Sequence, residues 1–291
     1  MLPTRYAQFK TNVEWFIKDR FEQNYVEESK QNQALKRFFE ATQRWFDGGK
    51  RFRGVLAQVA YFRYKDDLSQ ILPWAWALEF VHAFSLVHDD MPELDNDILR
   101  RWKPTVWAKY SDWEALLVGD NLMMIAFELL SEVDDKVLPQ LLKLLSSSIG
   151  MRWMNGWQYM DVWYEHNPDD LNYSLLQQIH ARKTGALINA SLIWWAILWW
   201  ASNQEIELIS QYGKLLGMAF QISDDILDVV WTAAQTGKSV GGEQKWYVYF
   251  LGLEKAQQEL KKIVERWIDI AQELGDDKLK FLIEFMLGRN N

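Results

Sequence analysis

The chain has 291 residues, 49% of them hydrophobic, and a formal net charge of −8. Because the phosphates of nucleic acids recruit basic surfaces and this chain is acidic, we expect no nucleic-acid partner. The chain contains no cysteine, which excludes disulfides and thiolate metal sites. No linker-like or low-complexity stretch interrupts the pattern, so we expect one compact domain over residues 1–291.

The N-terminal segment MLPTRYAQFKTNVEWF carries charges where a secretory signal would need an apolar core. We therefore expect a cytoplasmic protein. The most apolar run, LIWWAILWWA from Leu192 to Ala201, is too short to cross a bilayer and predicts a buried helix.

Apolar residues recur at three- and four-residue spacing along most of the chain, which predicts helices. No period-two run bounded by turn signals predicts a strand. Gly48-Gly49, Pro92, Pro104, Pro168 and Gly241-Gly242 mark breaks. An all-α bundle is therefore expected, with sites built from side chains on facing helices. The helical segments are Ala75–Leu86, Ala115–Leu130, Leu138–Ile149, Leu175–Ile197, Ile206–Val230 and Leu251–Leu274.

Five carboxylates lie between Asp89 and Asp97 in SLVHDDMPELDND, directly after an apolar helical segment. An isolated acidic run is usually a solvated face. A second cluster, QISDDILD, lies inside the helix predicted to end at Val230. Its acidic residues, three and four apart, share one stripe of that helix, and apolar residues flank them. A solvated face is the alternative there as well. The stripe consists of Asp224, Asp225 and Asp228, with Gln221 one turn earlier.

Two aspartate clusters in a helical bundle suggest a site for hard divalent cations. Carboxylate oxygens without His or Cys favour Mg²⁺, with Mn²⁺ as a possible substitute, over zinc. An EF-hand loop is excluded, because Met91 and Arg100 stand where that loop needs a ligand and a glycine.

Basic residues accompany both clusters. Each alone is an ordinary surface cation, but together they could bind two diphosphates. A P-loop is excluded, since GGK lacks the GxxxxGK[ST] spacing. The cations are Lys50, Arg51 and Arg53 in GGKRFRG, Arg100, Arg101 and Lys103 after the first cluster, Lys183 (beside Thr184) in ARKTGAL, and Lys238 in QTGKSVGG.

These blocks together resemble the trans-isoprenyl diphosphate synthases, especially bacterial farnesyl diphosphate synthases. GGKRFRG, HDDMPELDND with LRR, GDNL, the glutamine of NGWQ, KTGALI and QISDDILDV occur in the family's order. The resemblance implies an isoprenoid-synthase fold, a single-domain bundle of about ten or more helices around a central cavity. It also implies a homodimer.

The resemblance assigns roles to individual residues. Its metal ligands are Asp89, Asp90, Asp95, Asp224, Asp225 and Asp228. Its contacts to the allylic diphosphate are Arg100, Lys183, Thr184, Gln221 and Lys238, and its contacts to isopentenyl diphosphate are Lys50, Arg53, His82 and Arg101. The most direct catalytic roles fall to Asp89, Asp95, Arg100, Lys183, Asp224 and Lys238.

The implied activity is a Mg²⁺-dependent condensation of an allylic diphosphate (dimethylallyl or geranyl) with isopentenyl diphosphate. Phe84 lies five residues before Asp89 on the predicted helix, where a ring could close the pocket for the growing tail. Together with the insertion Pro92-Glu93, it resembles the pattern of enzymes that make farnesyl diphosphate. The alternatives are an inactive subunit of a heteromeric synthase, a terpene cyclase and an acidic helical scaffold.

Tryptophan is unusually abundant, with 17 residues against 15 glycines. Six of these tryptophans stand where the family pattern has glycine. Ordinary divergence is one explanation. Our hypothesis is instead a gene in which UGA encodes glycine but has been translated as tryptophan. The six are Trp102, Trp153, Trp157, Trp195, Trp200 and Trp231.

Overall fold

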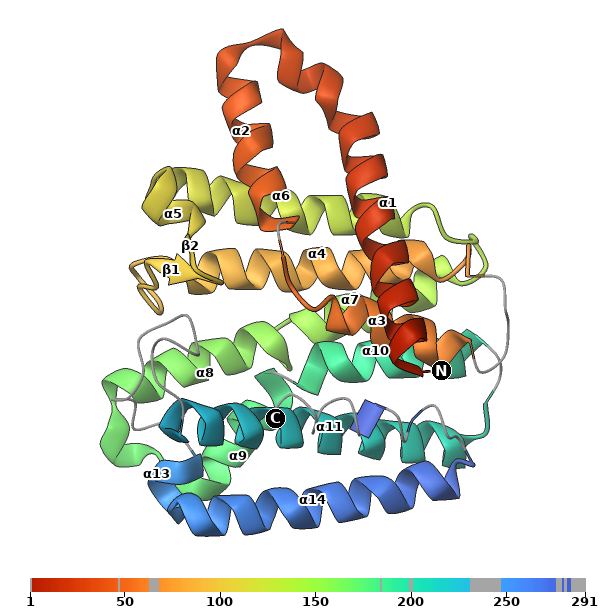
Figure 1. The fold of residues 1–291 in the computed structure, drawn as a ribbon, viewed down its shortest axis with the longest axis vertical. Helices are drawn as coiled ribbons and strands as arrows, with labels where there is room; N and C mark the ends of the chain where they lie inside the picture. The colour runs from red at the N-terminus through yellow and green to blue at the C-terminus, as the bar shows by residue number, and fades with distance from the viewer. Residues whose placement is uncertain are drawn as a thin grey trace. The chain divides into compact units, whose positions relative to one another are not determined.

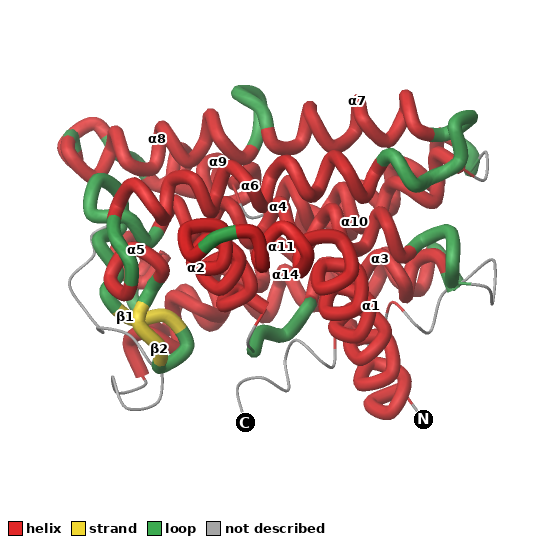
Figure 2. The backbone as a smooth tube through the Cα atoms, turned by 90° about the horizontal axis from the view of Figure 1, so that it is seen from above, coloured by secondary structure: helices red, strands yellow, loops and turns green. Residues whose placement is uncertain are grey.

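The computed structural model describes residues 2–46, 48–62, 68–183, 185–198, 201–230 and 247–275, together with residues 279, 282 and 283. Helices dominate this part of the chain, and two short strands are its only β-structure (Figure 2). The all-α prediction is confirmed. The chain divides into two units, residues 1–138 and 139–291. A single domain over the whole length stays a prediction.

The first unit contains six α-helices, one 3₁₀ turn and one small hairpin within its described residues. They are α1 (Leu2–Gln31), α2 (Gln33–Gln43), η1 (Arg44–Phe46), α3 (Phe52–Tyr61), α4 (Leu72–Asp89), β1 (Leu99–Arg100), β2 (Lys103–Pro104), α5 (Val106–Lys109) and α6 (Asp112–Leu130).

Polar side chains cap two helices of this unit, α2 and α6. The side chain of Asn32 accepts a hydrogen bond from the backbone N–H of Leu35 at the start of α2. Ser111 caps α6 by accepting from the N–H of Glu114 at 3.4 Å, and its own hydroxyl donates to the Glu114 carboxylate. That carboxylate also accepts from Nε of Arg37 at 2.5 Å. The cap of α6 is thereby joined to α2.

α4 and α6 lie side by side within this unit (Figure 1). α4 is apolar on most sides, as predicted, and buries Trp74, Trp76 and Leu78 completely, while α6 contributes Leu122 and Leu130 to the same core. The end of α4 that carries the first aspartates is thus held by a packed core.

The second unit contains the remaining helices. They are α7 (Leu138–Ile149), which begins at the boundary, α8 (Met154–His166), η2 (Pro168–Asp170), α9 (Tyr173–Lys183), α10 (Gly185–Leu198), α11 (Asn203–Val230), α13 (Tyr247–Leu251) and α14 (Leu253–Glu273).

α11 is the central helix of this unit and packs against α10 and α14 (Figure 1). It starts with a reciprocal cap, because Ser202 and Glu205 exchange hydrogen bonds between side chain and backbone. The rings of Tyr212 and Trp267 meet with centroids 5.2 Å apart and join α11 to α14. This core fixes the helix that carries the second aspartate cluster.

The helices agree closely with the predicted segments, and α7 has the predicted bounds. Two details differ. The segment predicted as one helix from Leu175 to Ile197 falls in two helices, α9, which ends at Lys183, and α10, which begins at Gly185. The hairpin β1–β2 was not predicted, because strands of two residues are too short to show a period. None of the described helices combines the length and the apolar character needed to span a membrane.

Candidate active site

The first aspartate segment folds back on the end of α4. The backbone N–H of Asp95 donates to the carbonyl oxygen of Asp89 at 2.9 Å, and the N–H of Asp97 donates to that of Asp90 at 3.1 Å. Asn96 has a φ of +52°, a left-handed conformation that asparagine tolerates better than most residues. The turn brings Asp95 next to Asp89 and leaves Asp89 partly exposed and Asp95 exposed.

Asp90 has a different environment, with only 2% of its surface accessible. Its Oδ1 accepts from Nε of Arg100 at 2.6 Å and lies 2.5 Å from Nη2 of the same guanidinium. Burial raises the pKa of the Asp90 carboxyl to about 6, although the hydrogen bond and charge of Arg100 act in the opposite direction. Asp90 therefore has a cationic partner within the protein.

The hairpin β1–β2 carries the basic residues that follow. Arg100 pairs with Lys103 across the antiparallel ladder. The turn between them, Arg101–Trp102, has φ values of +53° and +65°. A cavity of about 40 Å³ beside the hairpin suits an anion rich in oxygen acceptors. Its charged lining consists of Arg44, Arg100, Arg101, Lys103 and Asp90.

The glycine pair before α3 allows Arg101 to approach the backbone closely. Gly48 and Gly49 have φ values of +78° and +99°, and a Cβ on Gly49 would lie 2.7 Å from Nη1 of Arg101. Lys50 remains exposed. Arg51 is 4% exposed, and its guanidinium donates to the carbonyl oxygen of Phe46. The motif GGKRFRG thus directs successive cations to different surroundings.

Four arginines lie near enough to His82, on α4, for their charges to act on its imidazole. Desolvation, followed by the nearby positive charges, holds the pKa of His82 well below its usual value, so the imidazole is neutral at pH 7. Desolvation also lowers the pKa values of Arg53 and Arg101 to about 10, which leaves both guanidinium groups charged at pH 7. The charges acting on His82 are those of Arg53, Arg101, Arg100 and Arg51.

Glu79 belongs to this arginine cluster and was not predicted from the sequence. It is 5% exposed, and its Oε1 accepts from the N–H of Gly54 at 2.8 Å. Its negative charge partly offsets the lowering of the pKa values of Arg53 and Arg101. It links α4 to α3 and offsets repulsion among the arginines. One signal was present: Glu79 and His82 are the only polar residues from Pro73 to Phe84, and they lie three apart on one helix face.

The second aspartate cluster lies on α11, as predicted. Asp224 is partly exposed, whereas Asp225 is 2% exposed. The Oδ1 of Asp225 accepts from Nε2 of Gln221 at 2.9 Å, and its Oδ2 accepts from the backbone N–H of Tyr247 at 2.8 Å. The side chain of Asp228 lies outside the described part.

Three predicted diphosphate contacts cannot be placed. Lys183 ends α9, but its side chain is outside the described part, as are residues Thr184 and Lys238. Among the candidate glycine positions, Trp200 and Trp231 also lie outside it, and so does the side chain of Trp195.

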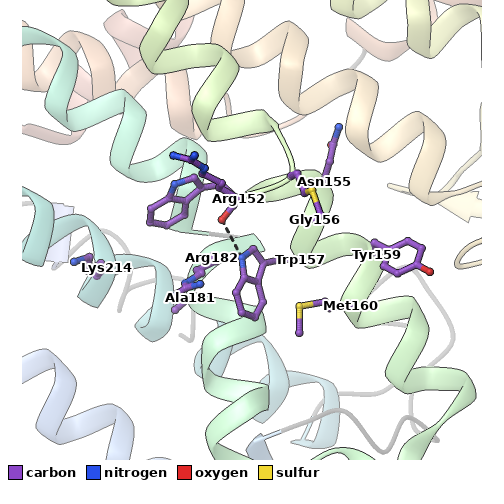
Figure 3. Close-up of a pocket in the computed structure, with 11 residues that line it drawn as sticks. Arg152, Asn155, Gly156, Trp157, Tyr159, Met160, Ala181, Arg182 and Lys214 are labelled. Atoms are coloured by element: carbon purple, nitrogen blue, oxygen red, sulfur yellow. Dashed lines mark hydrogen bonds between the residues drawn. The ribbon is translucent and has the colours of Figure 1, made fainter.

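A cavity of about 1280 Å³ lies in the second unit, at the start of α8 (Figure 3). Trp157 is 8% exposed there; its indole N–H donates to the carbonyl oxygen of Arg152 at 3.0 Å, and Arg182 lies over its ring at 4.5 Å. Arg152, Arg182 and Lys214 supply its charge. None of the predicted diphosphate or metal contacts is among the described residues that line this cavity.

The aspartates supply the donor type that Mg²⁺ prefers. In the described part of the chain, no three carboxylate or imidazole groups converge on one point. Mg²⁺ usually takes one or two protein carboxylates and completes its shell with water and substrate phosphates. Asp89 with Asp95 in the first unit, and Asp224 in the second, fit that requirement. That any of the six aspartates binds metal stays a prediction.

Comparison with known proteins identifies the family. Residues 35–286 match the polyprenyl synthetase family. A farnesyl diphosphate synthase of Micrococcus luteus is 36% identical over 251 residues, which cover 84% of this chain and 86% of the relative. A geranylgeranyl diphosphate synthase of Cyanophora paradoxa is 34% identical over 257 residues, which cover 84% of each chain.

Solved structures agree with the sequence comparison. A geranyltransferase of Helicobacter pylori, complexed with magnesium and isoprenyl diphosphate, has a TM-score of 0.77 at 29% identity and covers 96% of this chain and 97% of its own. An FPP/GFPP synthase of Zymomonas mobilis has a TM-score of 0.80 at 30% identity, with coverage of 97% and 98%. The protein therefore belongs to the polyprenyl synthetase family of prenyltransferases.

Proposed function

We propose that this protein condenses an allylic diphosphate with isopentenyl diphosphate, with farnesyl diphosphate as its main product. The observation that carries the proposal is the arginine cluster around His82, in the same unit as the Asp89–Asp95 turn. Cations and metal-binding oxygens together suit two diphosphate substrates. Relatives named farnesyl and geranylgeranyl diphosphate synthase support this reaction class.

The residues divide between the two substrates. Lys50, Arg53, His82 and Arg101 bind isopentenyl diphosphate in this proposal, and Arg100, Gln221, Lys183, Thr184 and Lys238 bind the allylic diphosphate. His82 is neutral, so it orients its substrate by a hydrogen bond and adds no charge. The arginines supply the positive charge, and their lowered pKa values still leave them protonated at pH 7.

Asp89, Asp95 and Asp224 would hold Mg²⁺, or Mn²⁺ in its place, and the bound ion would neutralise diphosphate charge. The allylic C–O bond then breaks, and Arg100 stabilises the negative charge that develops on the departing pyrophosphate. The double bond of isopentenyl diphosphate supplies the electron pair of the new C–C bond. The proton lost from that substrate passes to pyrophosphate, so no side-chain base is required.

We also propose a homodimer formed through α6. Four large apolar residues lie on one face of this helix and are exposed: Trp113 at 65%, Leu116 at 46%, Leu117 at 47% and Met124 at 54%. Exposed apolar faces of this kind usually mark interfaces. A second copy of the same helix would cover it with a matching surface, as two-fold symmetry requires.

The test is incubation with Mg²⁺, isopentenyl diphosphate and a series of allylic diphosphates, with product length read by chromatography. We expect a C15 diphosphate and no product when EDTA is present. A terpene cyclase would instead release a hydrocarbon or alcohol without consuming isopentenyl diphosphate. An inactive subunit would form product only when a partner synthase is added. Either result would refute the proposal.

A further inference from the structure

The two aspartate pairs share an arrangement that their sequences do not reveal. In the first pair Asp89 is partly exposed and Asp90 is 2% exposed. In the second pair Asp224 is partly exposed and Asp225 is 2% exposed. The buried member is the second residue in both pairs. The two carboxylates of each pair therefore meet different surroundings and can serve different purposes.

The buried member of the first pair is committed to Arg100. Nε and Nη2 of that guanidinium both lie within 2.6 Å of a single oxygen, Oδ1 of Asp90. Burial acts to lower the pKa of Arg100, but the hydrogen bond to Asp90 and the charges of Asp90, Asp97 and Asp89 together leave that pKa raised. Asp90 also ties the turn to α4, since its carbonyl oxygen accepts from the N–H of Asp97. Asp90 thus fixes the direction in which Arg100 presents its remaining N–H groups.

The buried member of the second pair is committed to two donors. Gln221 lies one turn before Asp225 on α11 and donates to one carboxylate oxygen, while the N–H of Tyr247, at the start of α13, donates to the other. Asp225 therefore orients Gln221 and also anchors α13 to α11. Tyr247 is fully buried, so this anchor lies inside the core.

A metal ion needs more room than either buried carboxylate offers. Mg²⁺ keeps several of its waters when it binds to protein, so its ligands must face a space that admits a hydrated ion. Asp89 and Asp224 retain exposed surface, whereas Asp90 and Asp225 retain almost none. Asp90 is already paired with a guanidinium, which lowers the electrostatic gain from binding a second cation.

We propose that the second aspartate of each pair, Asp90 and Asp225, is a positioning residue that holds a diphosphate-binding side chain, Arg100 or Gln221, instead of binding metal. This inference rests on the proposed function, because it takes the allylic diphosphate as the ligand of Arg100 and Gln221. The first aspartate of each pair keeps the metal role.

Binding of a sulfur-bridged allylic diphosphate analogue, measured by calorimetry, separates the two roles without requiring turnover. Asp90→Asn and Asp225→Asn should weaken binding of the analogue about tenfold to a hundredfold at saturating Mg²⁺, since each loses a charge-assisted hydrogen bond. In these two variants, a titration of Mg²⁺ at saturating analogue should give a Mg²⁺ concentration for half-maximal complex formation within about twofold of wild type. Asp89→Asn and Asp224→Asn should raise it about tenfold or more. Exposed Glu93 on the same turn supplies the control Glu93→Gln, which should change neither quantity.

A double-mutant cycle tests whether Asp90 acts through Arg100. If it does, the variant carrying both Asp90→Ala and Arg100→Gln should bind the analogue no more weakly than Arg100→Gln alone. The positioning role of Asp90 would be overturned if the double variant lost affinity for the analogue by the product of the two single-variant factors. It would also be overturned if Asp90→Asn needed as much Mg²⁺ as Asp89→Asn.

Hydrogen exchange tests the role of Asp225 in the absence of any ligand. Asp225→Ala should speed exchange of the Tyr247 amide, while Asp224→Ala should leave it protected. Unchanged protection in Asp225→Ala, or a Mg²⁺ requirement in Asp225→Asn as high as in Asp224→Asn, would overturn the positioning role of Asp225. If wild type binds no analogue with Mg²⁺, the proposed function fails and takes the ligand assignment with it. The exchange result would still decide whether Asp225 anchors α13.

Discussion

The guanidinium of Arg101 packs directly against the backbone of Gly49, where an added Cβ would lie 2.7 Å from Nη1. Gly49→Ala should therefore displace Arg101 from the arginine cluster around His82. Because one charged contact to isopentenyl diphosphate is lost, we expect its KM to rise about tenfold or more. Steady-state kinetics with varied isopentenyl diphosphate measures this change.

Gly48 supplies a matched control. Its φ of +78° also disfavours a side chain, but its nearest neighbour, Cδ of Arg101, lies 3.9 Å from a built Cβ. Gly48→Ala should therefore lower the free energy of unfolding by about 1–2 kcal/mol, as Gly49→Ala should, because both replace a glycine of positive φ. Unlike Gly49→Ala, it should leave the KM for isopentenyl diphosphate near wild type. Equal KM values in the two variants would show that Arg101 moves aside without consequence.

Metal dependence follows from the exposed aspartates. Asp89→Ala and Asp224→Ala should each lower turnover by several orders of magnitude, because each removes an oxygen ligand from a site that must offset diphosphate charge. Turnover is measured across a Mg²⁺ series, and EDTA should abolish it in wild type. Near-normal activity in either variant would contradict a metal-bridged mechanism.

Phe84 should set product length. It is 6% exposed on α4, and its ring meets His88 edge-on with centroids 5.7 Å apart. Phe84→Ala vacates volume one turn before the aspartates and should shift the product beyond C15, at a stability cost of about 3–5 kcal/mol. Phe84→Leu is a milder version, and Phe80→Leu, one turn further from Asp89, is the control. Identical product profiles in all of these would place the end of the pocket elsewhere.

The dimer proposal predicts that a charge on the α6 face dissociates the protein. Leu117→Asp places a carboxylate in the centre of the proposed interface, so sedimentation should show a monomer where wild type is a dimer. Lys143→Gln changes an exposed residue on α7, outside the proposed interface, and should leave the assembly intact. A wild-type monomer at micromolar concentration would refute the proposal.

Much of the fold can be predicted from the spacing of apolar residues, because long helices such as α4, α7 and α11 repeat that spacing over several turns. The hairpin β1–β2 was missed since its geometry depends on two backbone conformations at Arg101 and Trp102 and not on a pattern. Glu79 was missed because a single buried carboxylate has no motif. The resemblance named both Asp89 and Asp90 as metal ligands, with the catalytic role given only to Asp89, and the difference in their burial became visible only in the structure.

Two of the candidate glycine positions, Trp102 and Trp157, have opposite surroundings. Trp102 has a φ of +65° in a two-residue turn and is 62% exposed, so its backbone favours glycine and its ring gains little burial. Trp157 is the opposite case, with a buried ring, a hydrogen-bonded indole and a stacked arginine. The structure therefore supports the glycine hypothesis most directly at Trp102.

Trp102→Gly should stabilise the protein by about 1 kcal/mol in urea unfolding, because glycine adopts positive φ without the steric cost that a Cβ brings. Trp15, 64% exposed within α1, supplies the control, since Trp15→Gly should destabilise a helix interior by a few tenths of a kcal/mol to about 1 kcal/mol. Restoring glycine at all six positions would raise its count from 15 to 21. Average usage of about 7% predicts roughly 20 glycines in a chain of this length.

The coding DNA decides the origin of the tryptophans: we expect UGA codons at the six positions and a UGG codon at Trp15. If all 17 tryptophan codons are UGG, the hypothesis is refuted and the chain is a diverged synthase that carries a strained hairpin beside Arg100. If UGA is found, the glycine form should be the active enzyme and the tryptophan form should unfold at lower urea concentration.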